Sequence, residues 1–182
     1  NADRAAAIKE ALGDRALVGV AGRIIDRESA DAVLNSGKAD LVVMGRALIA
    51  DPDLPNKLAA NHDDAVIPCV GCNEGCVARL RERKAVACAV NPRTGCEDMY
   101  PRTHAAVSKH VAIVGGGPAG MQAALIAAER GHRVTLFEKR TRLGGLANIA
   151  ALPPHKDLYA VLVNRLSERL IASGVKVFLG TA

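Results

Sequence analysis

The sequence predicts an α/β protein in which parallel strands alternate with helices, in two parts joined by a cysteine-rich segment. Three observations predict it. Short, continuous apolar runs alternate with segments of helical period in the first part, as at 16–20 and 40–44. A glycine-rich turn at 115–120 stands between an apolar run and an alanine-rich segment in the second part. Four of the five cysteines lie between the two parts, within 69–88.

Residues 1–64 are predicted to alternate helix and strand. Asp26 is suited to cap a helix that ends near Gly37, and Asp51-Pro52 resembles another helix start. Each predicted strand is followed by a Gly-Arg pair. Because the strands are continuous apolar runs, they are typical of parallel strands covered on both faces. In order, the elements are helix 3–12, strand 16–20, helix 26–35, strand 40–44 and a helix from 51–52.

The rest of the chain divides into three parts. Residues 65–96 hold the cysteines and have little regular period, and residues 97–109 are polar, contain Pro101 and are interpreted as a linker. Residues 110–182 return to an α/β pattern. Its predicted elements are strand 111–115, helix 118–130, strand 133–138, a glycine loop at 143–146, a helix near 156–172 and a strand from 175.

Composition narrows the class of protein. Apolar residues make up 49% of the chain, enough for a core, but aromatics only 2%, which argues against stacking on nucleic-acid bases. The net charge of +5 is scattered, and no apolar stretch is long enough to span a membrane. We therefore expect a cytoplasmic protein acting on a small molecule. The first residue is Asn within a helical pattern, and the last strand has nothing after it. We interpret the chain as part of a longer polypeptide. The expected partners are the rest of that polypeptide and further copies of it in a homo-oligomer.

The glycine-rich turn has the G-x-G-x-x-G spacing that binds dinucleotides, with glycines at 115, 117 and 120. Gly115 suits a tight turn, Gly117 lets the backbone approach a pyrophosphate, and Gly120 lets helix and strand pack closely. The next strand ends in Glu138, whose carboxylate would accept hydrogen bonds from ribose hydroxyls and repel a 2′-phosphate. This half-site therefore favours FAD or NAD. A second glycine pair, 144–145, suits either a bulky cofactor or a simple turn.

The cysteines are spaced for metal ligation rather than for disulfides. Three thiols bunch within eight residues and the fourth is remote, which favours a [4Fe-4S] cluster over zinc, whose sites commonly use two separated C-x2-C pairs. Gly71 and Gly75 would let the loop wrap around the cluster. The fifth thiol, Cys96, is interpreted as a free or buried cysteine. The predicted ligands are Cys69, Cys72, Cys76 and Cys88.

Together these features resemble the 2,4-dienoyl-CoA reductase and trimethylamine dehydrogenase group of Old Yellow Enzyme-like flavoproteins. The resemblance covers essentially the whole chain, and the cysteine spacing followed by the glycine fingerprint is its most specific part. The residues that carry it upstream of the fingerprint are Gly22-Arg23, Gly45-Arg46, the segment 67–73 and Asn91-Pro92-Arg93.

The resemblance implies an organisation and a set of cofactors. Residues 1–64 would be the last two β/α units of an FMN-binding (β/α)8 barrel, 65–96 the iron–sulfur segment, and 110–182 the start of a Rossmann-like domain for FAD or ADP. Relatives hold the FMN phosphate at the two Gly-Arg pairs, after barrel strands seven and eight. No catalytic residue is expected here, because the substrate-side acid lies in earlier barrel strands. The implied cofactor-binding residues are Gly22, Arg23, Gly45, Arg46, Gly115, Gly117, Ala119, Gly120, Glu138, Gly145, Leu146 and Lys156.

The implied activity is electron transfer from NAD(P)H to FAD, through the [4Fe-4S] cluster to FMN, and then to an activated C=C bond such as that of an enoyl-CoA. Two alternatives stay open. One is an amine dehydrogenase of the trimethylamine dehydrogenase type, with reversed electron flow and ADP in place of FAD. The other is a non-catalytic iron–sulfur and FAD module of the glutamate-synthase small-subunit type, although that family has helices where this chain has the Gly-Arg strand ends.

Overall fold

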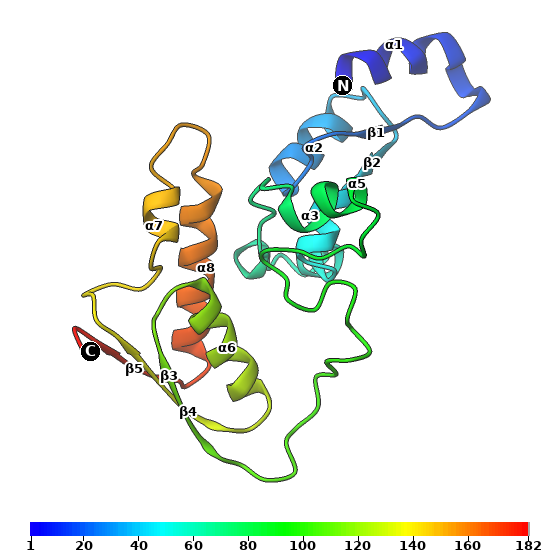
Figure 1. The fold of residues 1–182 in the computed structure, drawn as a ribbon. Helices are drawn as coiled ribbons and strands as arrows, with labels where there is room; N and C mark the ends of the chain where they lie inside the picture. The colour runs from blue at the N-terminus through cyan, green and yellow to red at the C-terminus, as the bar shows by residue number, and fades with distance from the viewer. Residues whose placement is uncertain (182) are drawn as a thin grey trace. The chain divides into compact units, whose positions relative to one another are not determined.

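The computed structural model describes residues 1–181, which form two units that divide between Gly95 and Cys96. Each unit contains a small sheet whose strands all run parallel (Figure 1). The predicted α/β class with parallel sheets is therefore confirmed. The division lies next to the predicted end of the cysteine segment, and the finer domain limits stay a prediction.

The first unit is built on a pair of short strands. Strand β1 (Gly19–Ala21) pairs with β2 (Leu41–Val43), and helix α2 (Arg27–Asn35) connects them after helix α1 (Ala2–Leu12) and a 3-10 turn, Gly13–Arg15. One apolar cluster joins these elements. Its buried members are Ala5, Val18, Val20, Ile24, Ala30 and Ala39.

The prediction that these strands are covered on both faces is wrong for the described chain. Leu41 and Val43 are 53% and 52% exposed, whereas Val20 is buried and Val42 packs partly against the cluster. Side chains alternate across a strand, so the helices cover the face that carries Val20 and Val42. Within the first unit, residues 1–95, the opposite face is exposed.

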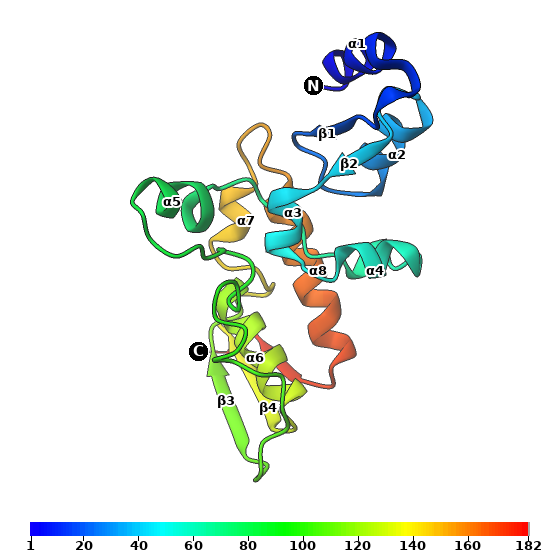
Figure 2. The ribbon, with the colours of Figure 1, turned by 90° about the vertical axis from the view of Figure 1, so that its right-hand side faces the viewer.

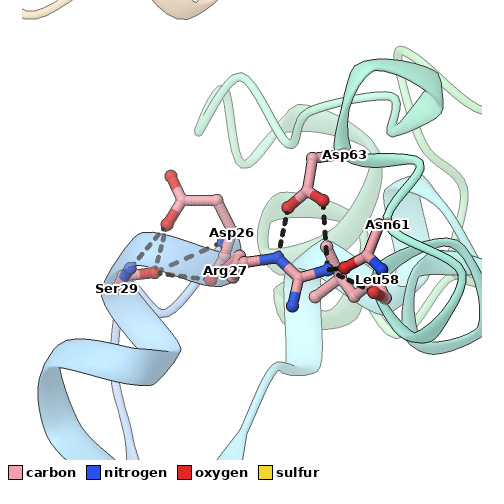
Figure 3. A network of polar contacts seen from close by, with 6 residues as sticks. All are labelled: Asp26, Arg27, Ser29, Leu58, Asn61 and Asp63. Carbon is pink, nitrogen blue, oxygen red and sulfur yellow. Dashed lines mark hydrogen bonds and ion pairs between the residues drawn. The ribbon is translucent and has the colours of Figure 1, made fainter. Parts of the chain in front are cut away.

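The start of α2 is fixed by a capping box and by an arginine network (Figure 3). The Asp26 carboxylate accepts a hydrogen bond from the Ser29 backbone N–H at 2.8 Å, as the sequence predicts. Arg27 donates from Nε and Nη2 to the two carboxylate oxygens of Asp63, at 2.8 and 3.1 Å. It also donates to the Leu58 carbonyl and, at 3.4 Å, to the Asn61 side chain. This network ties α2 to the segment that follows helix α4 (Leu54–Ala59).

The helix predicted to start at Asp51-Pro52 is misplaced. Helix α3 (Gly45–Ala50) begins directly after β2, so that Gly45 and Arg46 lie in its first turn, and Asp51 ends it. The next helix, α4, begins at Leu54 with Pro55 in its first turn. The reason is that the Asp51 carboxylate is buried and bonded to Lys57 Nζ and the Ile67 N–H, instead of capping a helix.

The cysteine segment contains little regular structure. A 3-10 turn (Asp63–Ala65) precedes it, and a π-helical turn (Glu74–Ala78) leads into the short helix α5 (Arg79–Arg81). Between Arg81 and His110 the described chain forms no helix or strand.

The second unit is a three-stranded sheet covered by helices. The order is β3-β4-β5, and helix α6 packs against β3, β4 and helix α8 (Figure 2). Met121, Leu136 and Leu170 are fully buried where these elements meet. Every element predicted here exists, with ends shifted by one or two residues. The bounds are β3 His110–Val114, α6 Pro118–Glu129, β4 Arg133–Glu138, α7 Ala147–Ala150, α8 Leu158–Ala172 and β5 Lys176–Leu179.

Within residues 1–181, every helix is too short or too polar to cross a lipid bilayer.

Candidate functional site

The four predicted ligand cysteines line one pocket in the first unit. All four thiols are free and half-buried. Arg46 and Ile49 of α3 form part of the same lining, together with Asn73 and Gly75 from the cysteine loop. The structure thus brings residues of α3 and of the cysteine segment together around one pocket.

Gly75 brings the remote fourth cysteine to the other three. The Ala87 N–H donates to the Gly75 carbonyl at 2.6 Å, and a Cβ built on Gly75 would lie 2.5 Å from the Ala87 oxygen and 2.9 Å from the Cys88 Cα. Two backbones that approach so closely leave no room for a side chain. Glycine at this position therefore allows residues 87–88 to close against the loop that carries Cys72 and Cys76.

Helix α3 and Asp51 anchor the cysteine segment at both ends. Before Cys69, the buried Asp51 carboxylate accepts the Ile67 N–H at 2.8 Å. After Cys88, the Asn91 amide and the Thr94 hydroxyl both donate to the Ile49 carbonyl, at 3.0 and 3.1 Å. In the middle, Arg46 Nη1 donates to the Asn73 side-chain oxygen at 2.7 Å. The sequence did not single out these anchors, because bonds between residues so far apart leave no periodic signal.

The electrostatics of the pocket centre on Cys88. Burial raises the pKa of the Cys88 thiol, the Cys69 and Cys72 thiols nearby raise it further, and the backbone N–H groups of Val90 and Asn91 act in the opposite direction. In the described part of the chain, no three His, Cys, Asp or Glu side chains converge closely enough to hold one metal ion. The four cysteines are thus known to share one pocket lining, and their role as ligands stays a prediction. The fifth cysteine, Cys96, is not part of the pocket lining.

The second candidate site is the turn between β3 and α6. Strand β3 ends at Val114, Gly115 has a φ of 105°, and α6 begins at Pro118 with Gly117 as its N-cap. The prediction of a strand, a glycine turn and a helix in this order is thus met by the fold. The N–H groups at such a helix start face outward and can bind phosphate oxygens.

Gly120 is the position at which helix α6 meets the turn. A Cβ built on Gly120 would lie only 1.9 Å from the Gly115 carbonyl oxygen and 3.1 Å from its carbon. Both atoms belong to the backbone and cannot rotate away. The close packing that the sequence assigns to this glycine is therefore visible in the structure.

Glu138 closes the site from the end of β4. Its carboxylate accepts the Gly116 N–H at 2.6 Å and the Arg140 N–H at 2.9 Å, and the residue is only 6% exposed. These two bonds lower the pKa of Glu138 below its ordinary value, and the bond from the Arg140 N–H has the larger effect. The side chain is thus held as a carboxylate beside the glycine turn.

Replacing Glu138 with glutamine is expected to reduce the free energy of unfolding by about 1 kcal/mol at neutral pH. The Gly116 and Arg140 N–H groups bond different carboxylate oxygens, and glutamine has only one acceptor oxygen for them. A carboxyl whose folded-state pKa is lowered stabilises the fold fully above its unfolded-state pKa, and this contribution is lost as the pH falls through the folded-state pKa. The difference between wild type and E138Q should therefore shrink as the pH falls below about 4.3.

Urea unfolding at pH 7 and at pH 3.5 measures this difference. Glu168→Gln is the matched control, because Glu168 is an exposed carboxylate whose partner Arg165 lies 3.4 Å away. If E138Q is destabilised by the same free energy at both pH values, Glu138 is not a carboxylate whose pKa is lowered by folding.

The glycine pair 144–145 folds onto the glycine turn between β3 and α6. The Gly144 N–H donates to the Gly116 carbonyl at 2.8 Å, and a Cβ on Gly145 would lie 3.1 Å from the Gly117 Cα. In the described chain this pair lies against the glycine turn, and its contact with a cofactor stays a prediction.

The remaining predicted residues of the second unit are more exposed. Ala119 lies in the first turn of α6. Leu146 is 74% exposed directly before α7. Lys156 is also exposed, with its Nζ 5.8 Å from the centre of the Tyr159 ring, and no described contact joins it to the glycine turn.

The two Gly-Arg pairs of the first unit follow neighbouring strand ends. Ala21 pairs with Val43 in the parallel register, so both pairs emerge at the same edge of the sheet. Gly22 and Arg23 have φ values of 134° and 56° and are exposed, whereas Arg46 is half-buried. The arginines share the sheet edge, and Arg46 also reaches the cysteine pocket.

Two family models match the chain in separate regions. Residues 4–65 match the NADH:flavin oxidoreductase / NADH oxidase family, and residues 110–176 match the FAD dependent oxidoreductase family. The cysteine segment lies between the two matches.

Individual relatives match across both regions. Cinnamate reductase from Clostridium sporogenes is 47% identical over 89% of this chain, and NADH oxidase from Thermoanaerobacter brockii is 42% identical over 87%. The solved structure of a 2-naphthoyl-CoA reductase in complex with 2-naphthoyl-CoA covers 97% of the chain with a TM-score of 0.86 and 31% identity. The alignments cover 24%, 25% and 27% of those three proteins, so the chain spans about a quarter of their length.

Proposed function

Because the chain belongs to the group of NADH:flavin oxidoreductases that includes 2,4-dienoyl-CoA reductase and trimethylamine dehydrogenase, we propose that it carries the cofactor relay of such an enzyme. The single observation that carries the proposal is the pocket lined by four cysteines in the chain segment between two flavin-enzyme regions. The proposed activity is NAD(P)H-dependent reduction of an activated C=C bond.

Four parts of the chain take separate roles in this proposal. Residues 1–64 form the last two β/α units of an FMN-binding barrel, 65–96 the cluster segment, 97–109 a linker, and 110–182 the start of a Rossmann-like FAD domain. The parallel pairing of β1 with β2 and of β3 with β4 and β5 supports this division. So does the match of each family model to one of the two flavin-binding regions.

The FMN phosphate is assigned to Gly22, Arg23, Gly45 and Arg46. Loops after the last two strands of a barrel commonly bind phosphate at the carboxyl ends of those strands. Each guanidinium would supply charge-assisted hydrogen bonds, and the backbone N–H groups of the glycines would approach the phosphate oxygens without a side chain in the way.

The [4Fe-4S] cluster is assigned to Cys69, Cys72, Cys76 and Cys88. The donor set fits, because thiolates are the ligands such clusters take and because these four line a common pocket. Gly75 holds Cys88 against the loop, and the N–H groups of Val90 and Asn91 stabilise its thiolate form.

FAD is assigned to the glycine turn of the second unit. The N–H groups at the start of α6 would bind the pyrophosphate, beside Gly115, Gly117, Ala119 and Gly120. Glu138 would accept hydrogen bonds from the ribose hydroxyls, for which its ionised state is suited. Gly145, Leu146 and Lys156 are proposed to contact the cofactor further along the chain.

When bound, these cofactors supply all of the redox chemistry: hydride acceptance from NAD(P)H, one-electron transfer through the cluster, and reduction of the substrate double bond. The residues of this chain bind and orient them. Glu138 and the glycine turn would bind the adenosine end of FAD, and the two arginines would bind the FMN phosphate. The cysteine pocket would hold the iron–sulfur cluster on the same chain.

Anaerobic purification of the longer polypeptide that contains this chain, followed by analysis of its metal, acid-labile sulfide and flavin, tests the proposal. We expect iron and sulfide in equal amounts, FMN and FAD, and NAD(P)H-dependent reduction of an activated alkene such as cinnamate or an enoyl-CoA. Zinc in place of iron, or a protein without FMN, would refute it. Flavin reduction by a secondary or tertiary amine, but not by NAD(P)H, would favour the amine dehydrogenase alternative.

A further inference from the structure

Arg46 links two features that lie apart in the sequence, the Gly-Arg pair after β2 and the cysteine loop. It belongs to the Gly-Arg pair after β2, yet it lines the cysteine pocket and donates from Nη1 to the Asn73 side-chain oxygen at 2.7 Å. Asn73 lies in the loop between Cys72 and Cys76 and lines the same pocket. One hydrogen bond thus joins the end of a strand to the middle of the cysteine loop.

The geometry leaves the guanidinium able to serve a second partner. A guanidinium has five N–H donors in a rigid fork, and Asn73 takes one of them. The remaining donors can bind phosphate oxygens in the bidentate manner that arginine favours. A long side chain has many rotamers, so a fixed acceptor at one end of the fork reduces the freedom that phosphate binding would otherwise have to remove.

Asn73 also has a backbone reason for being asparagine. Its φ is 62°, in the left-handed region that asparagine tolerates better than most residues. A test of its side chain must therefore keep this backbone conformation. Glycine does so without strain and removes the side chain together with its amide group.

We propose that Asn73 is a positioning residue that holds Arg46 between the cysteine pocket and the FMN phosphate, so that flavin binding and the cluster depend on the same guanidinium. This inference rests on the proposed function, because it needs both cofactors. Because both effects act through one side chain, whatever displaces Arg46 weakens FMN binding and removes positive charge from beside the cysteine pocket.

The experiment compares Asn73→Gly with wild type in the holoenzyme. We expect the Kd for FMN to rise about 3- to 10-fold, as for the loss of one hydrogen bond. We also expect the midpoint potential of the cluster, followed by EPR during a redox titration, to become more negative, because a nearby positive charge stabilises the reduced form. In an Arg46→Met background, adding N73G should change neither quantity further.

Asn61→Gly is the matched control. Asn61 also has a left-handed backbone, with φ of 57°, and its side chain also accepts a bond from an arginine, Arg27, but it does not line the pocket. We expect N61G to leave the Kd for FMN and the cluster potential unchanged.

The outcomes separate this inference from the proposed function. A wild-type protein without cluster or FMN refutes the proposed function and the inference with it. If wild type holds both, an N73G variant with unchanged FMN affinity and potential refutes the inference alone. So does an N73G effect of equal size in the R46M background, or a loss of cluster without any change in FMN binding.

Discussion

Replacing Gly120 with alanine is expected to abolish FAD binding and to destabilise the second unit by about 3 kcal/mol, the upper end of the usual cost of overpacking. The added Cβ would meet the Gly115 carbonyl oxygen at 1.9 Å. Helix α6 would have to move away from β3, and its first N–H groups would move with it. The loss of FAD follows because those groups and the glycine turn form the proposed pyrophosphate site together.

Flavin content after gel filtration and urea unfolding check this prediction. Gly19→Ala is the control, because its Cβ would lie at an ordinary contact distance of 3.7 Å from the Leu41 Cβ and its backbone is not left-handed. A G120A protein that retains FAD at the wild-type level would show that α6 does not need this close approach.

Replacing Cys88 with alanine is expected to lower bound iron and sulfide about 10-fold or more, since even residues that only support a metal ligand cost 10- to 100-fold in affinity when replaced. Cys88 is the predicted ligand farthest along the chain from the other three, so without it only three thiols can bind the cluster. The backbone of residues 87–88 closes against Gly75, and Cys88 lines the same pocket as the other three cysteines.

Cys96→Ala is the matched control, because Cys96 has a free, half-buried thiol like Cys88 but does not line the pocket. Iron and sulfide analysis, together with the absorbance of the cluster, measures both variants. Equal loss of iron from C88A and C96A would contradict the ligand set, as would a C88A protein with full iron content.

The sequence predicted the elements of the second unit well because each carries its own local signal. The glycine spacing at 115–120, the apolar runs on either side and the acidic end of β4 are all local, and the strands and helices follow them to within one or two residues. Asp26 was predicted as the N-cap of α2 for the same reason. In the first unit the misplaced helix start at Asp51 shows the limit of such signals. An Asp-Pro pair suits a helix start, but here the carboxylate is bonded to Lys57 and Ile67 instead.

The amino-acid pattern alone predicted the parallel α/β class, the grouping of four cysteines in one segment and the glycine turn between strand and helix, because spacing along the chain is enough to specify them. Only the tertiary structure decided how the pieces connect. The closure of Cys88 against Gly75, the two anchors on the Ile49 carbonyl and the bond from Arg46 to Asn73 join residues 12 to 45 positions apart. Such contacts depend on how the backbone folds back on itself, and this depends on packing that no short stretch of sequence contains.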